Sequence, residues 1–440
     1  MGILQQKNII IFIVVAAFMA SLSYSFYFRI TPVVDAGTYD KIALNILAGY
    51  GYHEDINKTA LFDHAITKVG PIYEYFLAII YKLFGHYFEV VWVIQAILHA
   101  ATAWLIFLIC QRIFKDGGVT VGLIAAAIIG FHPDLIEISA MLMTETLYLF
   151  LITLFLFVFI HVYQQPKNWL YSGTLGVVTA LAILARPPMA LFLPIILFFY
   201  LINKEYSRFV IFGVTLSLIF TPWVVRNYKI YNQFIPTTLV GVHNLWVGNT
   251  EQYFGSQANG GINPATVYSE KFGYADFSNE AQKQFTSFVL AKPFLFAQIT
   301  ATRFMAYFSA IRPMGFWFYQ HGVSQAIFVI SSAVAILFLF ISGLSGILLS
   351  LKQKNNLLYY LTAFTMTAPL ALIFAVVESR YRFQIYPFLA IFGAYFLYNV
   401  YGSWLNVRKP FFYAASFILV ISIIDIWISW QVILEHLRLF

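Results

Sequence analysis

Ionisable side chains in this 440-residue chain lie close to the ends of long apolar stretches. The set contains both acidic and basic residues and one histidine. Its members are Asp35, Asp40, Lys68, His132, Glu145, Arg186, Arg226, Glu378, Arg380 and Arg382. Lysine and arginine bind phosphate, arginine often through two parallel hydrogen bonds. A carboxylate can act as a general base on a hydroxyl or an amine. These residue types predict a site that holds an anion and moves a proton.

The acidic residues also have a structural interpretation. Asp35 could cap a helix or lie solvated in a loop, and Asp40 fits the first turn of a helix. Glu145 could cap its own helix together with Thr144. From position alone, the structural role is the better interpretation for Asp40, and the two interpretations are equally good for Glu145.

The basic residues have alternatives of the same kind. Arg186, Arg380 and Arg382 could extend to lipid headgroups, and the last two could instead pair with Glu378. His132 is more typical of a hydrogen-bonded histidine at the membrane interface than of a metal ligand. The sequence has no H-x-x-H or C-x-x-C spacing, so no metal site is predicted from spacing.

The composition shows what surroundings these residues have. Hydrophobic residues make up 61% of the chain and charged residues 10%, whereas a soluble domain carries about 25% charged residues. A water-soluble fold cannot bury so much apolar surface, so soluble enzymes, secreted disulfide scaffolds and disordered chains are excluded. The net charge of +7 reports membrane orientation rather than a nucleic-acid partner. We expect an all-α polytopic membrane protein.

Eleven apolar stretches approach the length of about 20 residues that a spanning helix needs. They cover residues 8–28, 89–110, 118–133, 144–163, 169–185, 188–203, 209–225, 323–350, 357–377, 384–402 and 411–434. Residues 118–140 can instead form one longer unit that is broken at Pro133. The alternative for the first stretch is a cleaved signal peptide.

The basic residues of the short connections predict the orientation. With the N-terminus in the cytoplasm, ten of the 26 lysines and arginines lie in short inner connections. Only four lie outside the membrane beyond the two long loops, and long loops contribute little to orientation. We therefore expect a cytoplasmic N-terminus and an extracytoplasmic site.

Three regions follow from this arrangement. Residues 1–225 form an N-terminal transmembrane catalytic module that includes a first outer loop, 29–88. Two apolar stretches of this loop, KIALNILAGYGY and GPIYEYFLAIIYKLFG, are expected as helices at the membrane surface. Residues 226–322 form a small, partly irregular extracytoplasmic domain, and residues 323–440 form the C-terminal transmembrane helices.

Several fragments resemble the GT-C superfamily of membrane glycosyltransferases. The resemblance is to glycosyltransferase family 39, which includes protein O-mannosyltransferases and lipid A aminoarabinose transferases. It covers most of the chain and depends on the order and spacing of the fragments. They are the Asp35 segment, GPIYEYFLAIIYKLFG, HPDLIEISAMLMTETLYLF, ARPPMALFLP, TPWVVRNYKIYNQFIPTTLVGVHNLWVGN and ESRYRFQIYP. The implied fold is the GT-C fold.

The resemblance implies roles for individual residues. Asp35 matches the family's acidic residue in the first outer loop and would be the general base. A second acid, if the reaction needs one, would be Asp40 or Glu145. The donor phosphate would be held by Lys68, Arg380, Arg382 and Arg186. Arg226, Tyr381, His132 and Glu378 are further candidates.

The resemblance also implies substrates and partners. The donor would be a sugar on a polyprenyl phosphate such as undecaprenyl phosphate, transferred with inversion on the extracytoplasmic face. The acceptor would be a glycolipid, a polysaccharide or a protein, and the partners include membrane lipids but no nucleic acid. A divalent metal is possible, and no other cofactor is expected. The implied location is a bacterial inner membrane.

Three other classes of protein remain as alternatives. A transporter or flippase of lipid-linked sugars would also have many spans and an anion site. Such proteins usually contain internal repeats, and none is visible here. The others are an O-antigen-ligase-like enzyme, which would use a lipid pyrophosphate, and a non-catalytic assembly protein. Because the charges gather at one membrane surface, an enzyme is the favoured interpretation.

Overall fold

The computed structural model describes residues 3–251, 263–310, 319–320 and 322–437, and over these residues the fold is helical without β-strands. Eight helices in this part of the chain are long and apolar enough to cross a membrane. They are α1 (Ile3–Phe28), α4 (Phe88–Ile113), α7 (Thr144–Gln164), α10 (Tyr206–Tyr231), α15 (Gly322–Ser350), α16 with α17 (Asn356–Thr367 and Leu370–Ile373), η3 with α18 (Ser379–Ile385 and Tyr386–Gly402) and α19 (Trp404–Leu437). The all-α polytopic fold is confirmed.

The other three predicted stretches form shorter helices. Helices α5 (Gly118–Gly130) and α6 (Pro133–Ser139) make a pair bent by 55°. Proline favours the first turn of a helix but cannot continue one, so the chain changes direction before Pro133, as predicted. Helix α8 (Trp169–Ala185), and η2 with α9 (Pro187–Ile202), are apolar but under 18 residues each.

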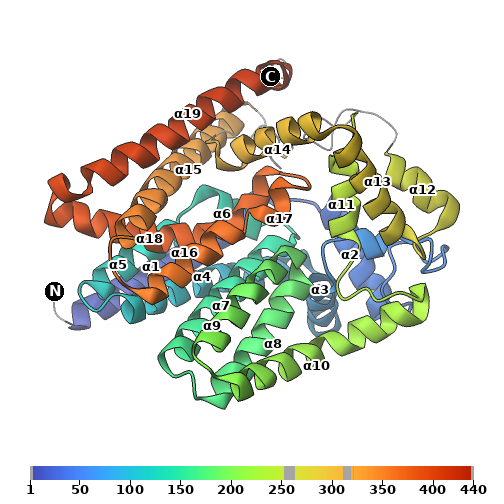
Figure 1. The fold of residues 1–440 in the computed structure, drawn as a ribbon, viewed down its shortest axis with the longest axis horizontal. Helices are drawn as coiled ribbons and strands as arrows, with labels where there is room; N and C mark the ends of the chain where they lie inside the picture. The colour runs from blue at the N-terminus through green and yellow to red at the C-terminus, as the bar shows by residue number, and fades with distance from the viewer. Residues whose placement is uncertain (1–2, 252–262, 311–318, 321, 438–440) are drawn as a thin grey trace.

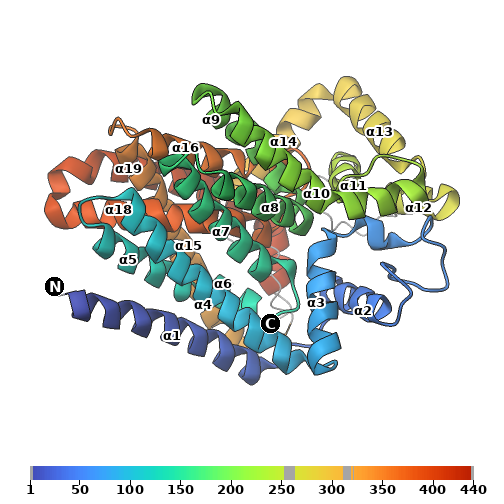
Figure 2. The same ribbon diagram turned by 90° about the horizontal axis from the view of Figure 1, so that it is seen from below.

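The spanning helices form one elongated bundle, with α1 along one edge (Figure 2). Helix α4 packs against α1, α5 and α7, and α15 packs against α18. The α15–α18 contact is close because α15 carries small residues there. A Cβ added to Gly346 would lie 1.9 Å from the backbone oxygen of Phe392. Small residues of this kind let membrane helices approach at backbone distance.

Two long connections form a layer beside one end of the bundle (Figure 1). The first loop contains α2 (Asp35–Leu47), η1 (His64–Thr67) and α3 (Pro71–Phe84), and the second contains α11 (Val240–Gly248), α12 (Pro264–Phe272), α13 (Phe277–Ala291) and α14 (Pro293–Phe308). The two loops share one apolar core, which contains Ile66 of the first and Trp246 and Phe277 of the second. The amide of Leu239 donates a hydrogen bond to the Ile66 carbonyl, 2.8 Å away.

The second loop, predicted as a small, partly irregular domain, contains several helices in its described part. Residues 264–272 form α12 and residues 277–291 form α13. The signal for α12 is local, because the Asn263 side chain accepts hydrogen bonds from the amides of Ala265 and Thr266 while Pro264 takes the first helical position. The parts of that prediction on residues 252–262, 311–318 and 321 lie outside the described residues.

Candidate active site

Asp35 is the first residue of α2, directly after the connection from α1. The helix N-terminus favours a carboxylate at this position. The preceding residue, Val34, has φ 51°, which is unusual for a β-branched side chain. Backbone strain of this kind is held only where surrounding contacts enforce it, and it is often found at functional sites.

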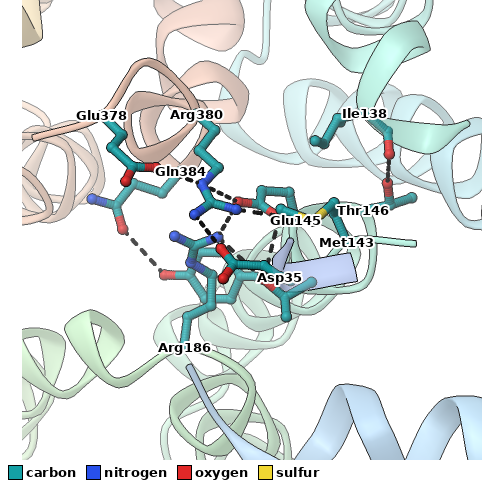
Figure 3. Close-up of polar contacts among 11 residues, drawn as sticks. Asp35, Ile138, Met143, Glu145, Thr146, Arg186, Glu378, Arg380 and Gln384 are labelled. Atoms are coloured by element: carbon teal, nitrogen blue, oxygen red, sulfur yellow. Dashed lines mark hydrogen bonds and ion pairs between the residues drawn. The ribbon is translucent and has the colours of Figure 1, made fainter. Parts of the chain in front are cut away.

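Arg380 brings Asp35 into contact with the C-terminal half of the chain. It lies in η3, and its Nη2 donates to Oδ2 of Asp35 at 2.7 Å. Its Nε donates to Oε2 of Glu378 at 2.9 Å and lies 3.7 Å from Oε1 of Glu145. Figure 3 shows the guanidinium between these three carboxylates. The side chain of Arg380 is buried, so its charge is balanced by neighbours rather than by water.

Arg186 forms the second half of the charge cluster. Its Nη1 lies 2.6 Å from Oε1 of Glu145 and donates to the hydroxyl of Thr144 at 3.2 Å. Its guanidinium also lies 5.2 Å from the ring centre of Tyr381. The position is enforced locally, because Pro187 follows and keeps Arg186 extended at the end of α8.

The cluster of Asp35, Glu145, Arg186, Glu378 and Arg380 thus contains three carboxylates and two guanidinium groups. Burial alone raises the pKa of Asp35, but the adjacent Arg380, with Lys68 and Arg186, outweighs it and holds that pKa below its usual value. The carboxylate is therefore charged at neutral pH. Removing one member of a buried ion pair leaves an unpaired charge and costs about 3–5 kcal/mol.

A cavity of about 370 Å³ opens beside this cluster, and we call it the central cavity. Asp35, Lys68, Arg380 and Tyr381 all line it, together with residues of both long loops. Lys68 Nζ lies 3.6 Å from Oε2 of Glu54. The cavity therefore combines one carboxylate from α2 with cations from two distant parts of the chain.

The segment that carries Lys68 is fixed by a close backbone contact. Gly70 is buried against the end of α8, where an added Cβ would lie 2.0 Å from the Leu184 carbonyl oxygen. Leu184 is two residues before Arg186. This contact therefore sets the distance between the lysine and the arginine cluster.

A small apolar pocket is lined by residues that flank Asp35 in the sequence. It is formed by the connection between α1 and α2, including Val33 and Ala36, and by Met141–Met143 before α7. The sulfur of Met143 lies 3.9 Å from Nη1 of Arg380. An apolar surface thus reaches the edge of the charged cluster.

Four predicted site residues lie away from the central cavity. Asp40 accepts hydrogen bonds from Tyr81 at 2.6 Å and His86 at 2.9 Å. Arg226 donates to the carbonyl of Tyr52 at 2.9 Å.

The other two predicted residues that lie away from the central cavity are Arg382 and His132, and both face the interior of the bundle. Arg382 donates to the carbonyl of Ser309 and faces the ring of Phe340. The ring of His132 lies 4.8 Å from that of Tyr386. The structure thus groups Asp35, Glu145, Lys68, Arg186, Glu378, Arg380 and Tyr381, and separates these from the remaining candidates.

Several cavity residues were not predicted from the sequence. Glu54, His64, Tyr39, His243 and Asn244 all line the central cavity. Burial lowers the pKa of His64 and lowers that of His243 to about 4, so both rings are neutral at pH 7 and can exchange hydrogen bonds with hydroxyl groups. Glu54 could have been suspected as an acid close to Lys68, whereas nothing local marks the others.

Within the described residues, no group of three or more His, Cys, Asp and Glu side chains is placed to hold a metal ion.

Comparison with known proteins finds a family model that matches part of the chain, and solved structures with a similar fold. Residues 64–225 match the family model of dolichyl-phosphate-mannose-protein mannosyltransferases. No curated protein sequence matches the chain significantly. The family match covers the segment that contains Lys68, Glu145 and Arg186.

Solved structures extend the likeness to the whole chain. The oligosaccharyltransferase of Archaeoglobus fulgidus, tethered with an acceptor peptide, superposes with a TM-score of 0.56 and 15% identity, over 98% of this chain and 55% of that one. The archaeal oligosaccharyltransferase AglB from the same organism, in complex with an inhibitory peptide and a dolichol-phosphate, gives 0.52 and 14%, over 98% and 56%. This chain spans about half the length of those proteins.

A third structure, ArnT from Cupriavidus metallidurans bound to undecaprenyl phosphate, gives a TM-score of 0.41 and 12% identity, over 90% of this chain and 78% of that one.

Together, the family match and the fold confirm the predicted resemblance to GT-C membrane glycosyltransferases.

Proposed function

We propose that this chain is an integral-membrane glycosyltransferase that moves a sugar from a polyprenyl-phosphate donor to an acceptor hydroxyl or amine. The observation that carries the proposal is the contact of Asp35 with Arg380 at the wall of a cavity that Lys68 also lines. The family match and the GT-C fold support the reaction class. Dolichol-phosphate in the structure of AglB supports a lipid-phosphate donor.

Arg380 and Lys68 are proposed to hold the donor phosphate. Both line the central cavity, and fixed cations stabilise the charge that develops on a leaving phosphate. Arg186 is paired with Glu145, so it contributes to the field around the phosphate and keeps Glu145 in place. The lipid chain is proposed to run along the apolar surface beside Val33 and Ala36, where the pocket itself measures only about 10 Å³.

Asp35 is proposed as the general base. The acceptor oxygen or nitrogen bonds to the anomeric carbon, its proton passes to the Asp35 carboxylate, and the bond from that carbon to the phosphate oxygen breaks. The lipid phosphate leaves with the electron pair, and attack from the opposite face inverts the anomeric centre. When the donor phosphate draws on Arg380, the guanidinium stabilises the Asp35 carboxylate less, so Asp35 becomes a stronger base.

Of the two candidates for a second acid, Glu145 fits the geometry better. It lies between Arg186 and Arg380, whereas Asp40 is bound by Tyr81 and His86. We assign Glu145 a positioning role, because it holds both arginines at the cavity wall.

The test is release of lipid phosphate from radiolabelled polyprenyl-phosphate sugars by the purified protein. Asp35→Asn is expected to lower transfer by at least 100-fold, the lower range for a positioned general base, while donor binding persists. Asp40→Asn, in the same helix, is the control that distinguishes the role of Asp35 from that of Asp40, and this variant is expected to retain transfer. Full activity of Asp35→Asn would disprove the assignment. Donor binding without release by the unchanged protein would favour a flippase instead.

The membrane and the orientation belong to the same proposal. We place the protein in a bacterial inner membrane with a cytoplasmic N-terminus, so that the central cavity lies on the extracytoplasmic side. The basic residues of the short connections support this orientation.

A further inference from the structure

A second cavity, of about 470 Å³, lies next to the central cavity within the first loop. Glu54 and His64 line both cavities, so the two share a wall. The volume is within the range of about 300–1,000 Å³ that small-molecule sites occupy. None of the residues assigned above to the donor lines this second cavity.

One wall of the second cavity is a face of α2. Lys41, Leu44 and Asn45 line it, and their spacing puts them on one side of the helix. Asp35 begins the same helix. At 1.5 Å per residue, Lys41 lies about 9 Å along the helix axis from Asp35. The cavity thus begins near the proposed base and extends away from the charge cluster.

The opposite wall is an irregular segment that Asp63 holds in place. The buried Asp63 carboxylate accepts hydrogen bonds from the amides of Glu54 at 3.0 Å, Asp55 at 2.7 Å and Ala65 at 2.9 Å. Asn45 also donates to the carbonyl of His53 at 2.8 Å. A wall fixed by this many hydrogen bonds is preformed, which lowers the entropy cost of binding a ligand.

The lining of the second cavity suits a polyhydroxylated ligand. Asp55 and Glu54 can accept hydrogen bonds from hydroxyls, and Lys41 and Lys58 can donate them. Because acidic and basic groups are mixed, the cavity does not select a strongly charged ligand. Leu44 and Ile56 add a small apolar surface for the carbon face of a sugar ring.

We propose that the second cavity binds the glycan part of the acceptor, either a free oligosaccharide or the head of a glycolipid. This inference rests on the proposed function and specifies the acceptor class. A peptide acceptor fits less well, because peptides are commonly held at sheet edges or in apolar grooves. The described residues contain no sheet, and the cavity offers only two aliphatic side chains.

Glu54 links the two cavities chemically. It pairs with Lys68 at 3.6 Å and accepts a hydrogen bond from Thr38, one turn after Asp35, at 3.0 Å. A donor phosphate that takes over Lys68 frees the Glu54 carboxylate for an acceptor hydroxyl. The neighbouring hydroxyl of the same sugar then points toward Asp35 and attacks the donor as described above.

The test is a substitution that narrows the second cavity and leaves the residues assigned to the donor unchanged. Ile56 is 51% exposed on its wall, so Ile56→Trp should fill space with little effect on folding. Thr59→Trp is the matched control, on the same loop but outside the lining. The probes are radiolabelled undecaprenyl-phosphate hexoses and pentoses as donors. The acceptors are neutral oligosaccharides, the same glycans on a short lipid, and Ser/Thr-rich peptides.

We expect transfer to a glycan, with a KM for that acceptor at least tenfold higher in Ile56→Trp than in Thr59→Trp. Comparing the glycan on a short lipid with the free glycan shows whether the acceptor is a glycolipid or a free oligosaccharide. Transfer to peptides alone, equal acceptor KM values in the two variants, or donor cleavage without any glycan product would each overturn the inference and leave the proposed function standing. No cleavage of any donor by the unchanged protein would overturn the proposed function itself.

Discussion

Asp35 and Arg380 are 345 residues apart in the chain, yet their side chains lie 2.7 Å apart in the structure. The pair explains how a carboxylate can remain charged in a half-buried position beside a membrane. Burial disfavours the charged form, and the guanidinium favours it more strongly. The same pair also limits the reactivity of Asp35, because a carboxylate with a lowered pKa is a weak base until its partner is engaged elsewhere.

The pH dependence of transfer should report this pair. Asp35 must be deprotonated to act, so kcat/KM is expected to show no acid limb from Asp35 until the pH falls below the usual aspartate range. The free energy of unfolding should change with pH in the same direction. The Asp35–Arg380 pair stabilises the folded protein above the pKa of the unfolded aspartate, about 3.9, and this stabilisation is lost as the pH falls through the lower pKa of the folded state.

Arg380→Gln should move that acid limb to higher pH, because only Lys68 and Arg186 then oppose the rise in the pKa of Asp35 that burial causes. We also expect a loss of about 100- to 1,000-fold in kcat, as for removal of a fixed donor to developing charge. Arg380→Lys keeps the charge and serves as the control for folding. An acid limb at the same pH in Arg380→Gln and the unchanged enzyme would show that the pair does not set the pKa of Asp35.

At the scale of elements, the site is assembled by short segments between long helices. Asp35 begins α2, Arg186 ends α8, Glu145 lies in the first turn of α7 and Arg380 lies in η3. Each segment is fixed by a local feature, such as Pro187 after Arg186. Helix ends are suited to this task because their side chains leave the packed interior while their backbone remains anchored.

Gly70→Ala tests how the Lys68 segment is fixed. The added Cβ would overlap the Leu184 carbonyl, so the segment must shift, at a cost of about 1–3 kcal/mol in the free energy of unfolding. We expect a lower Tm and a higher KM for the donor. Gly241→Ala in α11 is the matched control, because nothing lies within 4 Å of its Cβ position. Equal Tm and donor KM in the two variants would show that this contact does not position Lys68.

The sequence predicts the helices better than it predicts their contacts. All eleven apolar stretches are helical, and the break at Pro133 is where proline chemistry puts it. The helices α12 and α13 were missed because neither contains a long apolar run, although Asn263-Pro264 is a recognisable cap.

The same limit applies to the candidate site. Glu145 and Arg186 could be singled out because charges beside apolar stretches are conspicuous. The position of His243 at the central cavity depends on packing between distant segments, which no local pattern encodes. Likewise, Arg382 is two residues from Arg380, and only the structure shows that it faces Ser309 instead.

At the scale of the whole molecule, the layer formed by the two long loops creates the cavities. The loops share an apolar core around Ile66 and Trp246, and residues of both line the central cavity. A polar layer at one end of an apolar bundle lets the lipid and the soluble substrates reach the same point from different phases.

This architecture requires that both loops lie on one side of the membrane, opposite the connections α4–α5 and α15–α16. Lys271 of α12 is exposed in the second loop, and Lys115 and Lys352 are exposed in those two connections. Cys110, the chain's single cysteine, is buried, so it should not react in the folded protein. In intact cells, Lys271→Cys is therefore expected to react with a membrane-impermeant maleimide, and Lys115→Cys and Lys352→Cys only after permeabilisation.

The reverse pattern would place the central cavity on the cytoplasmic side, where the donor would have to be supplied before it crosses the membrane. Labelling of all three cysteines without permeabilisation would contradict a bundle that spans the membrane between the loops and these connections.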